Sequence, residues 1–274
     1  MSAALPPARI RLQRVHGVRV RVSVRGEGRP LLLVMGIGAS LEMWGPFEAA
    51  MVARGYQVIT FGLPGAGGSP ALVPPRRMGG LAELALAVVD ELGVGEVDVL
   101  GVSFGGIVAQ EVARRSRGRV RRLVLCATGP GLGGPPGRIS ALRHMVTPRR
   151  YTTPDYARRI AAELYGGQAR RDPAMHASMT SRYLRPPSLY GYLTQLYAIT
   201  GWTSVPWLWL VDVPTLVLNG DDDPIVRLAN GRLLAALLPD ARLMVLRGGG
   251  HLFLLDQTDE AAELVDAFLS GAAP

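Results

Sequence analysis

The stretch that decides the fold reads Val97-Asp98-Val99-Leu100-Gly101-Val102-Ser103-Phe104-Gly105. Its first six residues form an apolar run that is typical of a buried strand, and residues 106–113 have the pattern of a helix. A serine at a sharp strand-to-helix turn has a strained backbone, and a glycine on either side leaves room for it. The turn should expose the Ser103 hydroxyl at the carboxyl end of a sheet, beside free backbone N–H groups. The stretch therefore predicts a nucleophilic serine.

Strands and helices alternate on both sides of this turn. Two segments of alternating polarity, at 9–15 and 18–25, predict a hairpin with one solvated face. We expect further strands at 31–35, 56–61, 96–102, 119–126, 215–218 and 242–246, and helices at about 40–54, 79–92, 227–237 and 258–269. This alternation predicts an α/β fold, with a mostly parallel sheet of about eight strands, right-handed crossovers and helices on its faces.

The alternation stops at a glycine- and proline-rich segment, residues 129–137. Between there and residue 210 we find no strand pattern, but helical patterns such as 155–165 and 188–200. A helical insertion after the sixth strand is expected to cover the carboxyl edge of the sheet, where α/β sheets bind ligands. We therefore divide the chain into a core, residues 1–129 and 211–274, and a helical lid, residues 130–210.

A serine nucleophile needs a base, and the four histidines of the chain make the search short. His16 lies in the predicted hairpin turn, and His144 and His176 lie in the predicted lid. His251 alone follows a late strand, on the glycine-rich loop 248–250. From such a loop an imidazole can reach a neighbouring strand end, so we predict that His251 is the base.

The group that orients the base should leave the end of the strand at 215–218. Asp221, Asp222 and Asp223 all stand there, and adjacent acids are also typical of solvated helix caps. Spacing from the strand-ending Gly220 favours Asp223, with Asp221 as the alternative. The order Ser103, Asp223, His251 is that of an α/β-hydrolase and of neither common serine-protease fold.

An oxyanion hole needs two N–H donors directed at the developing negative charge. We expect one to be the backbone N–H of Phe104, directly after the nucleophile. The loop Gly36-Ile37-Gly38 follows the third strand, and its glycines allow the backbone to approach a substrate closely. We expect the second donor to be the N–H of Ile37, although an ordinary glycine turn is the alternative.

Composition narrows the remaining functions. The formal net charge is +8, but lysine is absent, which excludes a lysine nucleophile, and no aromatic-basic motif indicates nucleic-acid binding. The single cysteine, Cys126, ends an apolar run and is expected to be a buried thiol. No histidine pair or cysteine cluster has metal-ligand spacing, and we expect no cofactor. No apolar run is long enough to span a membrane, and residues 1–7 lack a signal pattern, so we expect a cytoplasmic protein.

Several motifs together resemble an α/β-hydrolase along the whole chain. The segments that carry this resemblance are 36–42, Pro64-Gly65-Ala66-Gly67-Gly68-Ser69, 101–106, 220–224 and Gly250-His251-Leu252-Phe253-Leu254. Within that superfamily, the lid segments 148–151, 164–167, 171–173 and 201–204 are similar to those of intracellular medium-chain-length poly(3-hydroxyalkanoate) depolymerases. The resemblance implies a serine ester hydrolase with Ser103, Asp223 and His251 as its triad. It also implies an apolar ester or polyester substrate, with a polymer granule surface as a further contact.

The chain departs from that pattern at three points. Phe104 stands where those depolymerases tend to have tryptophan, Gly62 replaces a common acid, and an additional glycine precedes His251. Relatives with the same motifs act on small substrates, so a hydrolase of a small ester or lactone, a carbon–carbon hydrolase and an acyltransferase stay open as alternatives. A non-catalytic binding module is a further alternative. An epoxide hydrolase or dehalogenase is disfavoured, because those enzymes need a carboxylate where Ser103 stands.

Overall fold

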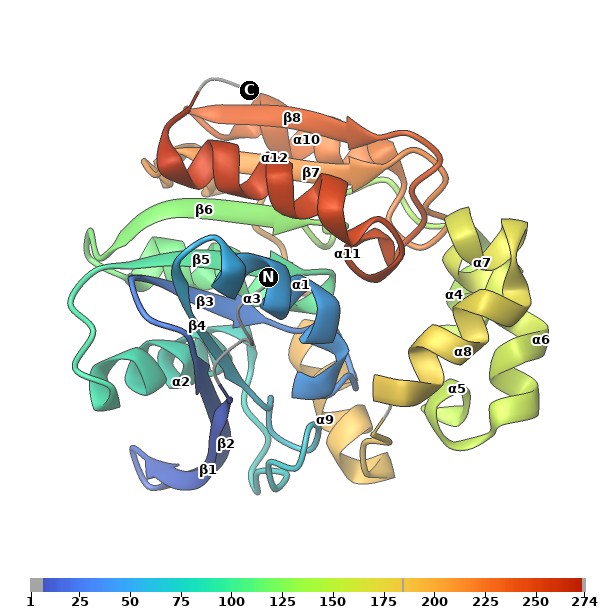
Figure 1. The fold of residues 1–274 in the computed structure, drawn as a ribbon, viewed down its shortest axis with the longest axis horizontal. Helices are drawn as coiled ribbons and strands as arrows, with labels where there is room; N and C mark the ends of the chain where they lie inside the picture. The colour runs from blue at the N-terminus through green and yellow to red at the C-terminus, as the bar shows by residue number, and fades with distance from the viewer. Residues whose placement is uncertain (1–6, 184, 273–274) are drawn as a thin grey trace, which may run out of the picture.

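An eight-stranded sheet forms the centre of the computed structural model, which describes residues 7–183 and 185–272 (Figure 1). Its spatial order is β1-β2-β4-β3-β5-β6-β7-β8. The strands are β1 (Arg9–Val15), β2 (Val18–Arg25), β3 (Arg29–Val34), β4 (Tyr56–Phe61), β5 (Val97–Val102), β6 (Val120–Cys126), β7 (Thr215–Gly220) and β8 (Ala241–Leu246). β2 pairs antiparallel with both β1 and β4, and the other pairs are parallel. The predicted mostly parallel sheet and its hairpin are confirmed.

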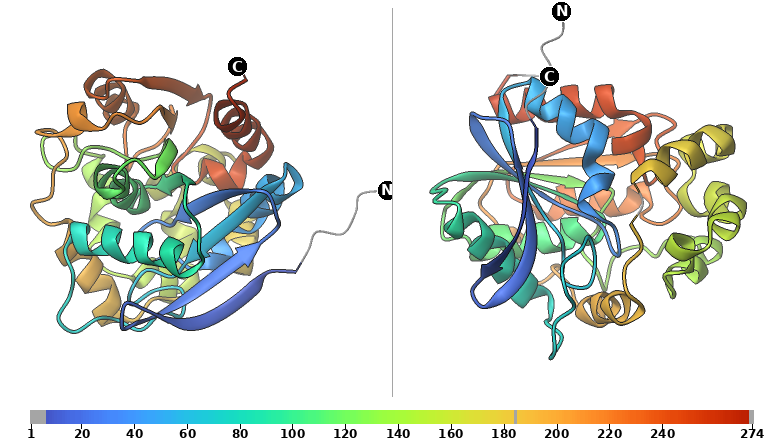
Figure 2. Two further views of the ribbon diagram at one scale, coloured as in Figure 1. Left: turned by 90° about the vertical axis from the view of Figure 1, so that its left-hand side faces the viewer. Right: turned by 60° about the horizontal axis from the view of Figure 1, so that its bottom comes forward.

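Helices cover both faces of the sheet, as predicted (Figure 2). One face carries α1 (Gly45–Ala53), α11 (Phe253–Asp256) and α12 (Thr258–Ser270), and the other carries α2 (Met78–Glu91), α3 (Phe104–Arg115) and α10 (Leu228–Leu237). Successive strand residues feed opposite layers: Leu31 and Leu33 pack under α1, whereas Leu32 packs with α2 and α3. Both faces are therefore buried, which explains the continuous apolar run of β3.

Most predicted boundaries differ by one or two residues, and the main departure lies at residues 40–54. The helix expected at 40–54 is a short 3₁₀ segment, η1 (Leu41–Trp44), followed by α1. Pro46 lies in the first turn of α1. Proline has no N–H to donate and favours the start of a helix, so it separates the two segments.

The chain between β6 and β7 is helical, as expected for residues 130–210, which we call the lid. Its elements are α4 (Ile139–Leu142), η2 (Arg143–Met145), α5 (Arg149–Thr152), α6 (Pro154–Tyr165), α7 (Gly167–Arg171), α8 (Pro173–Tyr183), α9 (Leu189–Ile199) and η3 (Leu208–Leu210). Figure 1 shows the arrowheads of the parallel strands pointing toward α4 to α8. The lid therefore lies at the carboxyl edge of the sheet, although its limits as a separate unit stay a prediction.

Two expectations from composition concern the burial of Cys126 and the presence of a membrane-spanning helix. Cys126, the last residue of β6, has no exposed surface, and this burial raises the pKa of its thiol above the usual range. The thiol therefore belongs to the core, as predicted. In the described part of the chain, no helix is long and apolar enough to cross a bilayer.

Candidate active site

Ser103 lies in a strained turn between β5 and α3, with φ 57° and ψ −120°. A side chain on Gly105 would place its Cβ 1.9 Å from the carbonyl oxygen of Val34, and one on Gly101 would place it 2.3 Å from the Gly105 carbonyl. Both flanking glycines are therefore required sterically. The Ser103 N–H donates to the Cys126 carbonyl at 2.9 Å, so the neighbouring strand end helps to fix the turn.

His251 reaches Ser103 from the loop after β8. Its Nε2 lies 3.0 Å from the Ser103 Oγ, and the histidine is 5% exposed. Gly250 has no room for a side chain, because a Cβ there would lie 2.3 Å from the carbonyl oxygen of Tyr165 in the lid. That carbonyl also accepts the His251 backbone N–H at 2.7 Å. The lid thus helps to position the imidazole.

Asp223 holds the other side of the imidazole. Its Oδ2 lies 2.7 Å from His251 Nδ1, and its Oδ1 accepts the backbone N–H groups of Ile225 and Val226 at 2.8 and 2.9 Å. The carboxylate is buried. A carboxylate can only accept, so this contact assigns the ring proton to Nδ1 and leaves Nε2 free to accept from Ser103.

The neighbouring acids point elsewhere. Asp221 accepts the Gly248 N–H at 2.7 Å, which fixes the loop that carries His251. Asp222 accepts the Gly167 N–H at 2.8 Å and pairs with Arg170 at 2.7 Å, which ties the core to α7. The three adjacent acids therefore have separate contacts, and Asp223 is the one brought to His251.

The other histidines lie away from Ser103. His16 is in the β1–β2 turn, and Nδ1 of His144 lies 2.7 Å from the Tyr156 hydroxyl within the lid. His176 lines the cavity above Ser103, but its Nδ1 lies 3.2 Å from a carboxylate oxygen of Asp256. Among the described histidines, His251 is thus the one that links a carboxylate to the Ser103 hydroxyl.

The loop at residues 36–38 lies beside Ser103, since a Cβ built on Gly36 would be 3.5 Å from the Ser103 Cβ. Within residues 7–183 and 185–272, no acceptor takes up the backbone N–H of Ile37 or of Phe104. Both N–H groups are therefore free for a ligand, as an oxyanion hole requires.

Two lid side chains hold this loop, and the sequence analysis gave neither a role. The Tyr151 hydroxyl donates to the Ile37 carbonyl at 2.7 Å, and Oε1 of Gln195 accepts the Gly38 N–H at 2.8 Å. Gln195 also donates to the Pro64 carbonyl at 3.1 Å and is buried. The only signal in the sequence was that Tyr151 stands in one of the lid segments singled out by the resemblance.

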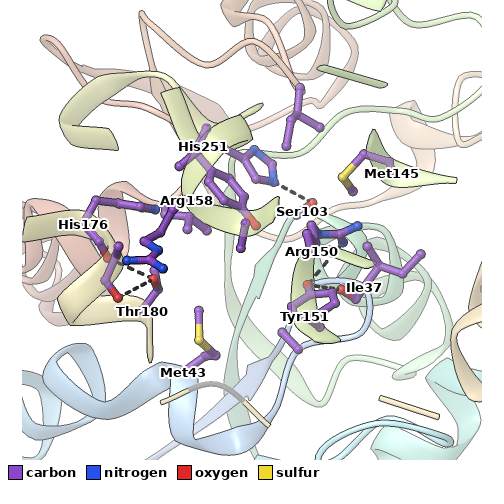
Figure 3. Close-up of a pocket in the computed structure, with 18 of the residues that line it drawn as sticks. Ile37, Met43, Ser103, Met145, Arg150, Tyr151, Arg158, His176, Thr180 and His251 are labelled. Carbon is purple, nitrogen blue, oxygen red and sulfur yellow. Dashed lines mark hydrogen bonds between the residues drawn. The ribbon is translucent and has the colours of Figure 1, made fainter. Parts of the chain in front are cut away.

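A cavity of about 600 Å³ opens over Ser103, between the core and the lid (Figure 3). The core contributes Met35, Ile37, Met43, Val102, Ile225 and Leu252, and the lid contributes Met145, Tyr151, Pro154, Ala157, Ala161 and Tyr165. These side chains are mainly apolar, so the cavity suits an aliphatic or aromatic group next to a small polar centre.

The aromatic residues of the lid divide between two locations. Tyr151 and Tyr165 line the cavity. The tryptophans do not: Trp202 donates from Nε1 to Glu111 on α3 at 2.9 Å, Trp207 packs beside Trp202, and Trp209 is 63% exposed. The lid tryptophans therefore fasten the lid to the core or face solvent, and they do not line the cavity.

Two further expectations concern the Phe104 side chain and metal binding. The Phe104 side chain is buried in the hydrophobic layer under the turn and is absent from the cavity lining, so it does not shape the cavity directly. In the described ranges, no group of three or more potential ligand side chains could hold a metal ion.

Comparisons with known proteins agree with the fold. A family model described as alpha/beta hydrolase fold matches residues 29–258. The chain is 44% identical over 240 residues to a poly(3-hydroxyalkanoate) depolymerase of Ectopseudomonas oleovorans, covering 88% of this chain and 84% of that one. It is 30% identical to a pimeloyl-[acyl-carrier protein] methyl ester esterase of Aromatoleum aromaticum, covering 88% and 98%. The crystal structure of the enol-lactonase from Burkholderia xenovorans superposes with a TM-score of 0.80 at 24% identity, covering 96% and 100%.

Proposed function

Because the chain belongs to the α/β-hydrolase family and is an ester-hydrolysing enzyme, we propose that it cleaves poly(3-hydroxyalkanoate) or its oligomers through an acyl-enzyme on Ser103. The proposed mechanism rests on the hydrogen bonds that connect Asp223 through His251 to Ser103. The proposed substrate rests on the similarity to the depolymerase over most of both chains.

In the first half of the reaction, Ser103 Oγ attacks the ester carbonyl carbon while His251 Nε2 accepts the hydroxyl proton. The imidazolium that forms is stabilised by the Asp223 carboxylate. Negative charge moves to the former carbonyl oxygen, where the N–H groups of Ile37 and Phe104 stabilise it. When the tetrahedral intermediate collapses, the bond to the alkoxy oxygen breaks and His251 returns its proton to that oxygen.

In the second half, water attacks the acyl-enzyme and His251 accepts a proton from it. Collapse of the second tetrahedral intermediate releases the carboxylic acid and returns the proton to Ser103 Oγ. The sum of the two halves is an ester and water giving an acid and an alcohol. No cofactor is needed for this balance.

The cavity supports an acyl group of medium length. Each methylene that its apolar wall removes from water stabilises binding by about 0.8 kcal/mol. Longer side chains of the polyester should therefore bind better. The chain has a single cysteine and cannot form an internal disulfide. This fits the reducing cytoplasm, which we include in the proposal as the location of the protein.

A small ester or lactone is the second candidate substrate. The methyl ester esterase and the enol-lactonase named above share the fold, and the former aligns over nearly its whole length. The cavity is also bounded by the lid, which suits a molecule that can be enclosed.

The two candidates are separated by giving the purified protein polyhydroxyalkanoate latex, hydroxyalkanoate dimers and a set of p-nitrophenyl esters. We expect release of 3-hydroxy acids from the polyester or its oligomers, and no release by Ser103→Ala. Turnover of small esters alone, with no release from polymer or oligomer, would exclude the polyester function.

A further inference from the structure

Arg150 is a buried cation in the wall of the candidate active site. It lies on the short helix α5, its residue is 4% exposed, and it lines the same cavity as Ser103. Figure 3 labels Arg150, Ser103 and Tyr151 among the side chains that line this cavity. The nucleophilic mechanism described above gives this charge no role.

The partners of Arg150 are neutral. Its guanidinium donates to the hydroxyl of Tyr192 at 2.7 Å and to that of Tyr151 at 3.2 Å, and it lies over both rings, 4.4 Å from the centroid of Tyr151 and 5.3 Å from that of Tyr192. In the part of the chain that the structure describes, no carboxylate pairs with it. Burying a cation without an anion costs free energy, although phenol oxygens and aromatic faces reduce that cost.

A second arginine in the cavity lining, Arg158, has different surroundings. Its side chain is 64% exposed and already pairs with Asp155 on the same helix. Arg158 is thus solvated and paired with a carboxylate, whereas Arg150 is buried with no anionic partner among the residues that the structure describes. A guanidinium held in one orientation is a ready partner for a carboxylate, which it binds with two parallel hydrogen bonds.

We propose that Arg150 binds a carboxylate of the substrate. Given the proposed function, on which this inference rests, that group is the free carboxyl end of a 3-hydroxyalkanoate oligomer. The terminal unit carries its carboxylate on the same short chain as the oxygen that is esterified to the next unit. Attack of Ser103 on that ester breaks the bond between the carbonyl carbon and the terminal unit's oxygen. The terminal unit then leaves as a 3-hydroxy acid, with the proton from His251 on its hydroxyl and its carboxylate on Arg150.

The test compares kcat/KM for two dimers of 3-hydroxyoctanoate, one with a free carboxylate and one with a methyl ester at that end. A charge-assisted pair contributes more free energy than a tenfold change in affinity requires. The native protein should therefore have a kcat/KM about tenfold or more higher for the free acid than for the methyl ester. Arg150→Gln should reduce this ratio to about one. Arg150→Lys keeps the charge but not the two parallel N–H donors of the guanidinium, and it should give an intermediate ratio.

Two features make the result specific. A purely structural role of Arg150 would lower both rates together and leave the ratio unchanged, and the wild-type ratio is informative even if Arg150→Gln fails to fold. Arg149→Gln, at an exposed neighbour, is the matched control and should keep the wild-type ratio. Equal rates for the two dimers in the native protein, or loss of the preference in Arg158→Gln instead, would overturn the inference and leave the proposed function standing. Failure to cleave either dimer would overturn the inference, and failure on the polyester latex as well, with p-nitrophenyl esters still turned over, would overturn both.

Discussion

The core and the lid contribute different parts of this site. The core carries the residues of the proposed triad on strand ends: Ser103 after β5, Asp223 after β7 and His251 after β8. The lid carries most of the surface that a substrate would touch, including Tyr151 and Tyr165. The difference suggests that the core sets the rate of bond breaking, whereas the lid sets which ester is broken.

The separation is incomplete, because the lid also supports the residues of the proposed triad and oxyanion hole. The Tyr165 carbonyl accepts the His251 N–H at 2.7 Å, and Tyr151 and Gln195 hold the loop that contains Ile37. A change in the lid can therefore alter the rate as well as the selectivity. Substitutions in the two regions distinguish these effects.

The largest effect is expected in the core, at Asp223. Asp223→Asn should lower kcat on the order of 10⁴-fold, because an amide that donates to Nδ1 would turn the imidazole proton toward Ser103. Steady-state kinetics with p-nitrophenyl butyrate measures the loss. Asp221→Asn and Asp222→Asn are the controls and should lose far less, because their carboxylates contact Gly248, Gly167 and Arg170 rather than His251. A loss at Asp221 as large as that at Asp223 would disprove the assignment.

The lid should control chain-length selectivity. Three more methylenes in the acyl chain should add about 2.4 kcal/mol, or about 50-fold in kcat/KM, as they enter the apolar cavity. We expect p-nitrophenyl esters to improve from acetate to medium acyl length. Ala157→Leu, in the cavity wall on α6, should remove most of this gain with little change for acetate, whereas Ala162→Leu, on the same helix but absent from the lining, should keep it. A constant preference for acetate would contradict the role of the lid and the polyester substrate.

The smallest effect concerns how the lid is attached to the core. Glu111 on α3 accepts from Trp202 of the lid at 2.9 Å and from Arg114 and Arg115 at 2.7 and 2.9 Å. Burial alone would raise the pKa of Glu111, but these three donors outweigh it and the pKa is lowered. Glu111→Gln should therefore reduce the free energy of unfolding by about 1 to 3 kcal/mol at pH 7.

The pH dependence of that difference follows from the sign of the shift. A folded-state pKa below the unfolded value means that the carboxylate stabilises the protein above its usual pKa of 4.5 and stops doing so as the pH falls through the lowered value. Urea unfolding of the wild type and the variant should thus converge in acid. Glu83→Gln, at an exposed partner of Arg115, is the control and should change little at any pH. A difference between wild type and Glu111→Gln that is independent of pH would contradict this account.

The sheet and the positions of the candidate catalytic residues could be predicted because they follow local rules. Continuous apolar runs marked the buried strands, and the glycines around Ser103 reported a turn that excludes side chains. Parallel strands bring their carboxyl ends to one edge, so Asp223 and His251 could be assigned to the same place from their positions after β7 and β8. The choice among the three acids depended on spacing, and the structure brings Asp223 to the imidazole as that spacing indicated.

The lid could not be predicted to the same depth, because its contacts join residues far apart in the sequence. The bond between Tyr151 and Ile37, and the pairing of Trp202 with Glu111, depend on how short helices pack, which no periodicity encodes. The sequence alone could not distinguish Tyr151, which lines the cavity, from Trp209, which is exposed. The burial of Arg150 without an anion likewise has no signal in an arginine-rich sequence.

The central claim is that Ser103 is the nucleophile that becomes acylated. A fluorophosphonate probe reacts with an activated serine hydroxyl, so the intact protein should gain one probe mass, located by peptide mass spectrometry on the peptide that contains Ser103. Ser103→Ala should gain none while its circular dichroism spectrum and melting temperature stay those of the wild type. Labelling that persists in a folded Ser103→Ala, or that falls on another serine in the wild type, would contradict the claim.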